Sequence, residues 1–130
     1  MIVIAEDDDT MRTVLAHALE RCGHAVTVVA DGQLVWPTIA AGSVDLLILD
    51  LRLPGMNGWE VLRRLKDERR RGDSRARRPP VIVISAQNDP ETQSFVLRLG
   101  ATAFMAKPLD LGEFHRAVRE ALRGEQTPPV

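Results

Sequence analysis

Acidic residues follow two short apolar stretches of the sequence. Ile2 to Ala5 leads directly into Glu6 and Asp7, and Leu46 to Leu49 leads directly into Asp50. Carboxylate oxygens without cysteine or histidine nearby suit a hard divalent cation, Mg²⁺ first. A carboxylate can also attack phosphorus as a nucleophile and form an aspartyl phosphate. If the two stretches end side by side, Asp50 can serve as both cation ligand and phosphoryl acceptor.

Two further residues could bind the oxygens of a phosphoryl group. Ser85 follows the apolar residues 81–84, and Lys107 follows 103–106. A hydroxyl and an ammonium group both donate hydrogen bonds to such oxygens. Lys107 is one of only two lysines among seventeen basic residues. A lysine in an arginine-rich chain suggests a compact point charge on a flexible stem.

Each of these residues has a simpler explanation when it is taken alone. An acid after a strand is usually a turn residue or a helix cap, which is the role that we expect for Asp9. Ser85 alone would be a loop or cap residue, and Lys107 alone would be a solvated charge. Their combination at the ends of several apolar stretches instead favours one site.

Short apolar stretches alternate with stretches of helical periodicity along the whole chain. We predict strands at residues 2–5, 25–29, 44–49, 81–84 and 103–106, and helices at residues 11–22, 33–41, 58–70, 89–99 and 110–122. Strands that are apolar throughout belong in a parallel sheet with helices on both faces. Right-handed crossovers bring the carboxyl ends of such strands to one edge, so the candidate site residues should meet there.

The helix boundaries carry their own signals. Asp89 before a proline and Asp110 three residues before Glu113 predict N-terminal caps. Gly23 and Gly100 predict the ends of the preceding helices. Within the short helix at 33–41, Pro37 should weaken or kink the backbone.

Length and composition exclude several classes of protein. The 130 residues suit one globular domain. Cys22 is the only cysteine, so neither an intrachain disulfide nor a thiolate metal cluster is expected. The start of the chain turns acidic after five residues, which does not fit a signal peptide, and no apolar run has the length of a membrane span. We therefore expect a cytoplasmic protein with no membrane partner.

The charges are distributed unevenly. Nine of the seventeen basic residues lie between Arg63 and Arg78, beside three acids, which leaves eight bases against fifteen acids elsewhere. Part of this region, residues 67–80, lies between the third predicted helix and the fourth predicted strand, and its bases run from Arg69 to Arg78. A solvated, mobile loop explains this basic segment most simply. A contact for an acidic partner or nucleic acid is the alternative. The segment has no interleaved aromatic residues, so it is weak evidence for DNA binding.

Four segments together identify a family resemblance. IVIAEDDD, LLILDLRLPGMNG, VIVISA and GATAFMAKPLD resemble, in order and spacing, the receiver domain of two-component response regulators. The similarity covers residues 1–123, and residues 124–130 would be a polar, proline-containing tail or the start of a linker. The resemblance implies an α/β, flavodoxin-like (βα)5 sandwich with a parallel sheet of strand order 2-1-3-4-5.

The resemblance also assigns roles to the acidic residues. Asp50 matches the phosphoacceptor, and Asp7 and Asp50 match the direct Mg²⁺ ligands, with Mn²⁺ as a substitute. Glu6 would act mainly through water, and the backbone carbonyl of Arg52 would be a third protein ligand. We further expect repulsion among the three acids to be unrelieved, and to cost stability, when no cation is bound.

The remaining site residues follow from the same resemblance. Ser85 matches the Ser/Thr switch position, and Lys107 matches the lysine that contacts the phosphoryl group. Phe104 matches a second switch position that is usually tyrosine, so it keeps the aromatic ring but lacks the hydroxyl. We expect this ring to point inward, because phenylalanine has no hydroxyl to leave unpaired. The Lys107-Pro108 peptide bond is expected to be cis.

The implied function is a phosphorylation-activated signalling switch. A histidine kinase or phosphotransfer protein would be the donor, and the face formed by the fourth helix, the fifth strand and the fifth helix would change on phosphorylation. An effector domain beyond the C-terminus and a phosphorylation-dependent homodimer are further expected partners. Nucleic acid would be bound only through such an absent domain. The chain would not be an enzyme, apart from self-phosphorylation by small donors and autodephosphorylation.

Two other classes were compared with this interpretation. An aspartate-nucleophile phosphohydrolase carries its nucleophile after the first strand in a D-x-D pattern, whereas the isolated candidate here follows the third strand. A binding module that no longer accepts phosphate would not need a complete set of site residues. That set is Glu6, Asp7, Asp50, Ser85 and Lys107.

Overall fold

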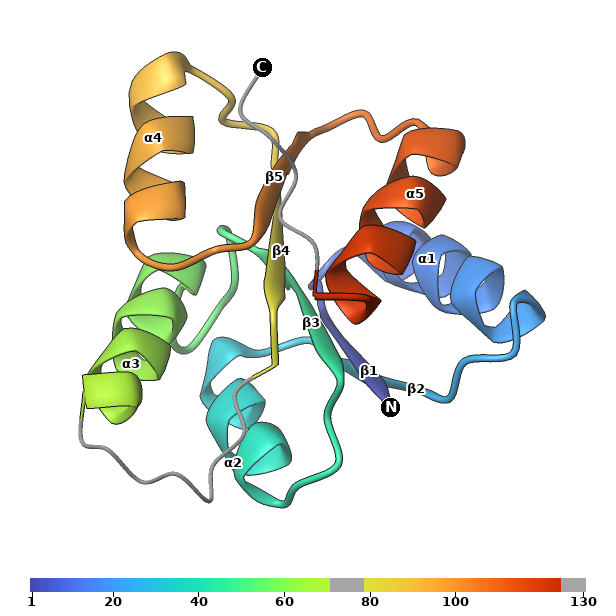
Figure 1. Ribbon diagram of the computed structural model, residues 1–130, viewed down its shortest axis with the longest axis horizontal. Coiled ribbons are helices and arrows are strands. Elements are labelled where there is room, and N and C mark those ends of the chain that lie inside the picture. The colour runs from blue at the N-terminus through green and yellow to red at the C-terminus, as the bar shows by residue number, and fades with distance from the viewer. Residues whose placement is uncertain (71–78, 125–130) are drawn as a thin grey trace.

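The computed structural model describes residues 1–70 and 79–124, and its centre is a five-stranded parallel sheet. The strands follow the order β2-β1-β3-β4-β5, which confirms the predicted order (Figure 1). They are β1 (Ile2–Ala5), β2 (Val26–Val29), β3 (Leu46–Asp50), β4 (Val81–Ser85) and β5 (Ala103–Ala106). Each stretch of strand pattern in the sequence therefore forms a strand.

Helices cover both faces of the sheet, as the apolar strands predicted. They are α1 (Asp9–Arg21), the 3₁₀ helix η1 (Gly32–Leu34), α2 (Val35–Ala40), α3 (Gly58–Arg70), α4 (Pro90–Arg98) and α5 (Leu111–Leu122). Helices α1 and α5 lie on one face, and α2, α3 and α4 lie on the other (Figure 1). The fold is the flavodoxin-like sandwich that the sequence predicted.

The core consists of two apolar layers, one on each side of the sheet. Alternate residues of β1 and β3 enter opposite layers: Val3 and Leu47 face α2, α3 and α4, whereas Ile2 and Leu46 face α1 and α5. All residues of β1, β3 and β4 are buried. Burial on both faces explains why these strands are apolar throughout. It also gives the residues at their carboxyl ends a rigid support.

Two strands extend further than predicted. β3 includes Asp50 and β4 includes Ser85, because Asp50 is in register with Ile84 and Ser85 with Ala106. The polar side chain does not end the strand, since the backbone pairing continues beneath it. Both side chains are therefore held by the sheet itself.

The predicted helix caps are confirmed at two positions and wrong at one. Asp89 and Asp110 accept backbone N–H groups at the starts of α4 and α5. For α1 the cap is Asp8, whose carboxylate accepts the N–H of Met11 at 2.8 Å, whereas Asp9 is the first helical residue. In a run of four acids, only the backbone geometry decides which one caps the helix.

The predicted helix at 33–41 is divided into η1 and α2. Pro37 is the third residue of α2 and therefore lies in its first turn. The backbone N–H groups of a first turn have no partner within the helix, so the missing N–H of proline is tolerated there. Pro37 accordingly marks the start of α2 rather than a kink within one longer helix.

The loop after β3 is held against the segment after β2. The N–H of Gly32 donates to the carbonyl of Pro54 at 3.0 Å. A Cβ atom on Gly32 would lie 1.4 Å from the carbonyl oxygen of Met56. Only glycine permits this close approach of two backbones.

Within the two described ranges, no helix has the length and apolar character needed to cross a membrane. Helix α3 extends to Arg70, as predicted, so it includes the first two residues of the predicted basic loop, Arg69 to Arg78. The rest of that loop, residues 71–78, and the tail at 125–130 lie outside the described residues.

Candidate phosphoacceptor site

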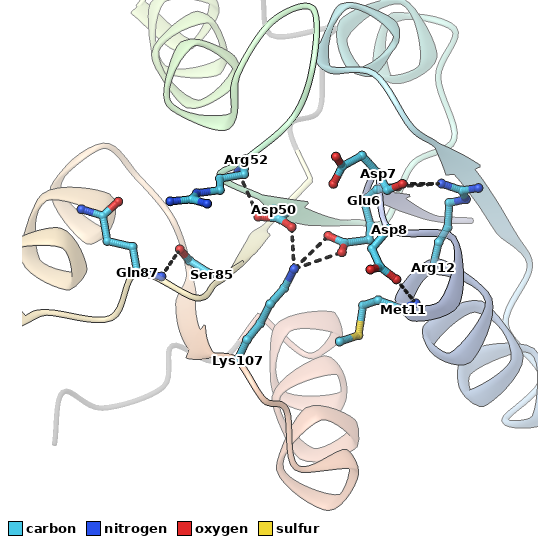
Figure 2. A network of polar contacts seen from close by, with 10 residues as sticks. All are labelled: Glu6, Asp7, Asp8, Met11, Arg12, Asp50, Arg52, Ser85, Gln87 and Lys107. Atoms are coloured by element: carbon cyan, nitrogen blue, oxygen red, sulfur yellow. Dashed lines mark hydrogen bonds and ion pairs between the residues drawn. The ribbon is translucent and has the colours of Figure 1, made fainter.

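Three carboxylates from two neighbouring strands meet at the carboxyl edge of the sheet. Glu6 and Asp7 follow β1, and Asp50 ends β3 (Figure 2). One oxygen from each of the three lies within 4.8 Å of the others. Glu6 is fully buried and Asp50 is 4% exposed, whereas Asp7 is exposed. The cluster therefore has two buried members and one that faces solvent.

Lys107, at the end of β5, reaches into this cluster. Its Nζ lies 2.6 Å from Oδ2 of Asp50, and 3.0 and 3.3 Å from the two oxygens of Glu6 (Figure 2). The Lys107-Pro108 bond is cis, as predicted. The expectation of unrelieved repulsion among the acids is wrong, because the ammonium group contacts both buried carboxylates. The ammonium group of Lys107 therefore relieves part of the repulsion between Glu6 and Asp50 without a metal ion.

Asp50 has donors on both carboxylate oxygens. Oδ1 accepts the backbone N–H of Arg52 at 2.9 Å, and Oδ2 accepts the ammonium group of Lys107. Burial by itself raises the pKa of Asp50, but hydrogen bonds, chiefly from Glu6 and Lys107, lower it overall. The carboxylate form of Asp50 is therefore stabilised, which is the form that can act as a nucleophile.

Glu6 shows the opposite behaviour. Burial, followed by its hydrogen bond with Asp50, raises the pKa of Glu6 to about 8, although Lys107 acts against this shift. Asp50 has the additional N–H of Arg52, so the proton is held on Glu6. The pair thus shares one proton near neutral pH. For Lys107, burial lowers the pKa, but its hydrogen bonds with Asp50 and Glu6 raise it overall.

The two predicted switch residues, Ser85 and Phe104, lie on β4 and β5. Ser85 is 2% exposed, and its hydroxyl oxygen accepts the N–H of Gln87 at 2.9 Å (Figure 2). Among the described residues, the Ser85 hydroxyl hydrogen has no acceptor, so it can be donated to a phosphoryl oxygen. Phe104 is half-buried and packs against the apolar layer of α2, α3 and α4.

A comparison with known families decides the identity of this site. The model of the response regulator receiver domain matches residues 2–119. The chain belongs to this family. A receiver domain of a two-component system serves phosphorylation-dependent signalling and is not a classical enzyme, so the phosphohydrolase interpretation is set aside.

Relatives and solved structures agree with this assignment. The receiver is 38% identical, over 99% of its length, to the DNA-binding transcriptional regulator NtrC of Azospirillum brasilense. It spans 25% of that relative. A Francisella response regulator receiver shares its fold with a TM-score of 0.85 and 23% identity, covering 95% of this chain and 96% of that one.

A third similar structure contains a magnesium ion. The receiver is 27% identical to the receiver domain of the sensor histidine kinase PA1611 from Pseudomonas aeruginosa PAO1, with a TM-score of 0.79. The alignment covers 94% of this chain and 96% of that one, and the PA1611 structure has a magnesium ion coordinated in its active-site cleft.

The residues present in this receiver fit a hard divalent cation. All three candidate side-chain ligands are carboxylates, and receiver domains generally bind Mg²⁺ at an acidic site of this kind. The exposed Asp7 leaves one side of the cluster open to water, which suits the partly hydrated binding that Mg²⁺ prefers.

The sequence-based reasoning missed one residue of this site. Arg12, in the first turns of α1, donates to the backbone carbonyls of Glu6 at 3.0 Å and Asp7 at 3.4 Å. The available signal was an arginine one helical turn after a run of acids. That signal is weak because a surface ion pair explains it equally well.

Proposed function

We propose that Asp50 accepts a phosphoryl group from a histidine kinase or a phosphotransfer protein. The main support is the 2.6 Å contact between Nζ of Lys107 and Oδ2 of Asp50 within a cluster of three carboxylates. This contact stabilises the ionised form of Asp50 and places a cation at its reactive oxygen. Neither Asp7 nor Glu6 combines these properties, because Asp7 is exposed and the pKa of Glu6 is raised.

Asp7, Asp50 and the backbone carbonyl of Arg52 would hold Mg²⁺ directly, and Glu6 would act through water. Mn²⁺ would be accepted at the same oxygens. When bound, the cation offsets the repulsion between the carboxylates and the incoming phosphoryl group. The buried positions of Glu6 and Asp50 fix two of the carboxylates before the cation arrives.

The transfer step uses the side chains that surround Asp50. An oxygen of Asp50 forms the new O–P bond while the P–N bond to the donor histidine breaks, and the imidazole leaves. Lys107, already at Oδ2, then donates to a phosphoryl oxygen, and Ser85 donates its hydroxyl hydrogen to another. Small acyl phosphates would serve as alternative donors, and water would later hydrolyse the acyl phosphate.

The output would come from a change in the face formed by α4, β5 and α5. Ser85 and Phe104 would act as switch residues, since Ser85 borders Asp50 and Phe104 lies on β5. Because the receiver spans a quarter of NtrC, we propose an effector domain beyond residue 130 as the output partner. A second copy of the receiver would bind the same face in a phosphorylation-dependent homodimer. Nucleic acid would be bound only through the effector domain.

Labelling with a small acyl phosphate tests this proposal. With Mg²⁺ present, the wild-type protein should gain one phosphoryl group, measured by intact mass spectrometry in cold, neutral buffer. Asp50→Asn should gain none. Asp67→Asn on α3 is the matched control and should be labelled like the wild type. Equal labelling of Asp50→Asn would overturn the assignment.

A further inference from the structure

Arg12 joins helix α1 to the loop that carries the acidic residues. Its guanidinium donates to the carbonyl of Glu6 at 3.0 Å and to that of Asp7 at 3.4 Å (Figure 2). It also pairs with the carboxylate of Asp9. The Arg12 side chain is 21% exposed, so most of it is covered by protein. One guanidinium group thus contacts two backbone carbonyls of the segment between β1 and α1 and the side chain of the first residue of α1.

The two carbonyls belong to residues whose side chains form the acidic cluster. The sheet holds Glu6 through its N–H, which donates to Val29 at 3.0 Å, but Asp7 is exposed and lies beyond the strand. The peptide planes after Glu6 and Asp7 determine where the Asp7 side chain points. Arg12 is bonded to the oxygens of both planes.

We propose that Arg12 is a positioning residue for the cation site. This inference rests on the proposed function, in which Asp7 is a direct ligand. Mg²⁺ requires nearly ideal octahedral geometry, so a ligand that moves freely on an exposed loop binds it weakly. By holding the two carbonyls, Arg12 keeps the Asp7 carboxylate facing Glu6 and Asp50 before a cation binds.

The hydrogen bonds of Arg12 would strengthen Mg²⁺ binding by positioning Asp7, whereas its positive charge would weaken Mg²⁺ binding. A guanidinium beside the site repels Mg²⁺, although its ion pair with Asp9 offsets part of that charge. Removal of a mere surface charge would therefore strengthen Mg²⁺ binding. Removal of a positioning group would weaken it. The sign of the change separates the two roles.

Two substitutions of Arg12 exploit this difference. Arg12→Lys keeps the charge but lacks the planar fork that reaches two carbonyls and a carboxylate together. Arg12→Met removes both the charge and the donors. Arg21→Lys, at the far end of the same helix, is the matched control. All three proteins and the wild type would be titrated with MgCl₂ by isothermal calorimetry, after melting curves in EDTA confirm that they fold.

Both Arg12 variants should bind Mg²⁺ roughly tenfold more weakly than the wild type. Loss of a group that holds a metal ligand in place commonly lowers metal affinity by at least this factor. Arg21→Lys should bind like the wild type. Wild-type affinity in Arg12→Lys, or tighter binding in Arg12→Met, would overturn the inference.

A measurement without metal separates this inference from the proposed function. In EDTA, ¹⁵N relaxation should give lower backbone order parameters at Asp7 and Asp8 in Arg12→Lys than in the wild type. Equal order parameters would overturn the positioning role. If the wild type itself bound no Mg²⁺, the proposed cation site would fail, whereas the relaxation comparison would still judge whether Arg12 orders the loop.

Discussion

At the scale of single residues, the ammonium group of Lys107 is the cation of the metal-free site. It contacts Asp50 and Glu6, which are almost completely buried, while its own side chain is 21% exposed. A buried ion pair contributes little compared with an apolar pair of the same shape, but loss of one partner leaves an uncompensated charge. The stability of the site therefore depends on Lys107.

Lys107→Met should destabilise the metal-free protein by about 3 kcal/mol, because Asp50 and Glu6 then lose their shared donor. Urea unfolding in EDTA measures the effect. Lys66→Met is a suitable control, since Lys66 is half-buried like Lys107 and its Nζ contacts an exposed backbone carbonyl, that of Arg98, at 3.4 Å. Addition of Asp50→Asn to Lys107→Met should restore part of the loss, because it removes the buried charge that has lost its partner. Equal stability of Lys107→Met and wild type would contradict this account.

The raised pKa of Glu6 predicts how the stability of the metal-free protein depends on pH. The folded state holds a proton on Glu6 up to about pH 8, whereas the unfolded chain releases it near 4.5. The stabilisation is therefore complete below pH 4.5 and is lost as the pH rises through 8. Asp50 has a lowered pKa, so its contribution is lost only on acidification below about 3.8.

We expect the unfolding free energy in EDTA to fall by about 3 kcal/mol between about pH 5 and pH 8. Glu6→Gln cannot titrate and should show a much flatter profile over this range. Urea unfolding at several pH values measures both curves. A wild-type profile as flat as that of Glu6→Gln would show that Glu6 is already ionised in the folded protein.

At the scale of secondary-structure elements, η1 contacts the loop after β3, and this contact holds the backbone that leads away from Asp50. The loop carries Arg52, whose N–H holds Asp50, and Gly32 holds the same loop through Pro54. A segment that is distant from Asp50 in sequence thereby helps to fix the backbone next to the acceptor.

Gly32→Ala should disturb this contact, because the new Cβ would lie 1.4 Å from the Met56 carbonyl oxygen. We expect a loss of roughly 2–3 kcal/mol in stability, the size of a severe backbone clash, together with weaker Mg²⁺ binding as the Arg52 carbonyl moves. Thermal melts and calorimetric titrations measure the two effects. Gly112→Ala on α5 is the matched control, since its Cβ would lie 3.1 Å from a side-chain oxygen of Asp110. Unchanged Mg²⁺ affinity in Gly32→Ala would show that the contact between Gly32 and the loop after β3 does not position the cation ligands.

At the scale of the whole molecule, cation binding and folding are linked. The cluster forms only when β1, β3 and β5 assemble, so the unfolded chain has no equivalent site. A Mg²⁺ concentration about ten times the dissociation constant should stabilise the fold by about 1.4 kcal/mol. Asp50→Asn should gain less, because it has lost a charged ligand. Melting curves of both proteins with EDTA and with MgCl₂ measure the difference, and equal gains would remove Asp50 from the cation site.

Local signals in the sequence predict the secondary-structure elements and the acidic residues of the site. Apolar runs such as Leu46 to Leu49 are local signals, and their alternation with helical stretches predicts a parallel sheet. The strand order was implied by the family resemblance. The carboxyl ends of the strands then meet at one edge, which places Glu6, Asp7 and Asp50 together. Asp89 and Asp110 were equally predictable as caps, because an N-cap depends on residues within one turn.

The contacts among these residues become visible in the folded structure and not in the sequence. The contacts of Lys107 with Asp50 and Glu6 join positions 57 and 101 residues apart, and they depend on the path of a long side chain. The bonds of Arg12 to two carbonyls depend on the orientation of peptide planes at the end of β1. Close backbone approach, as at Gly32, likewise follows from how two loops pack. Such distances are not encoded in residue type or spacing, because they arise when the assembled elements bring remote groups into contact.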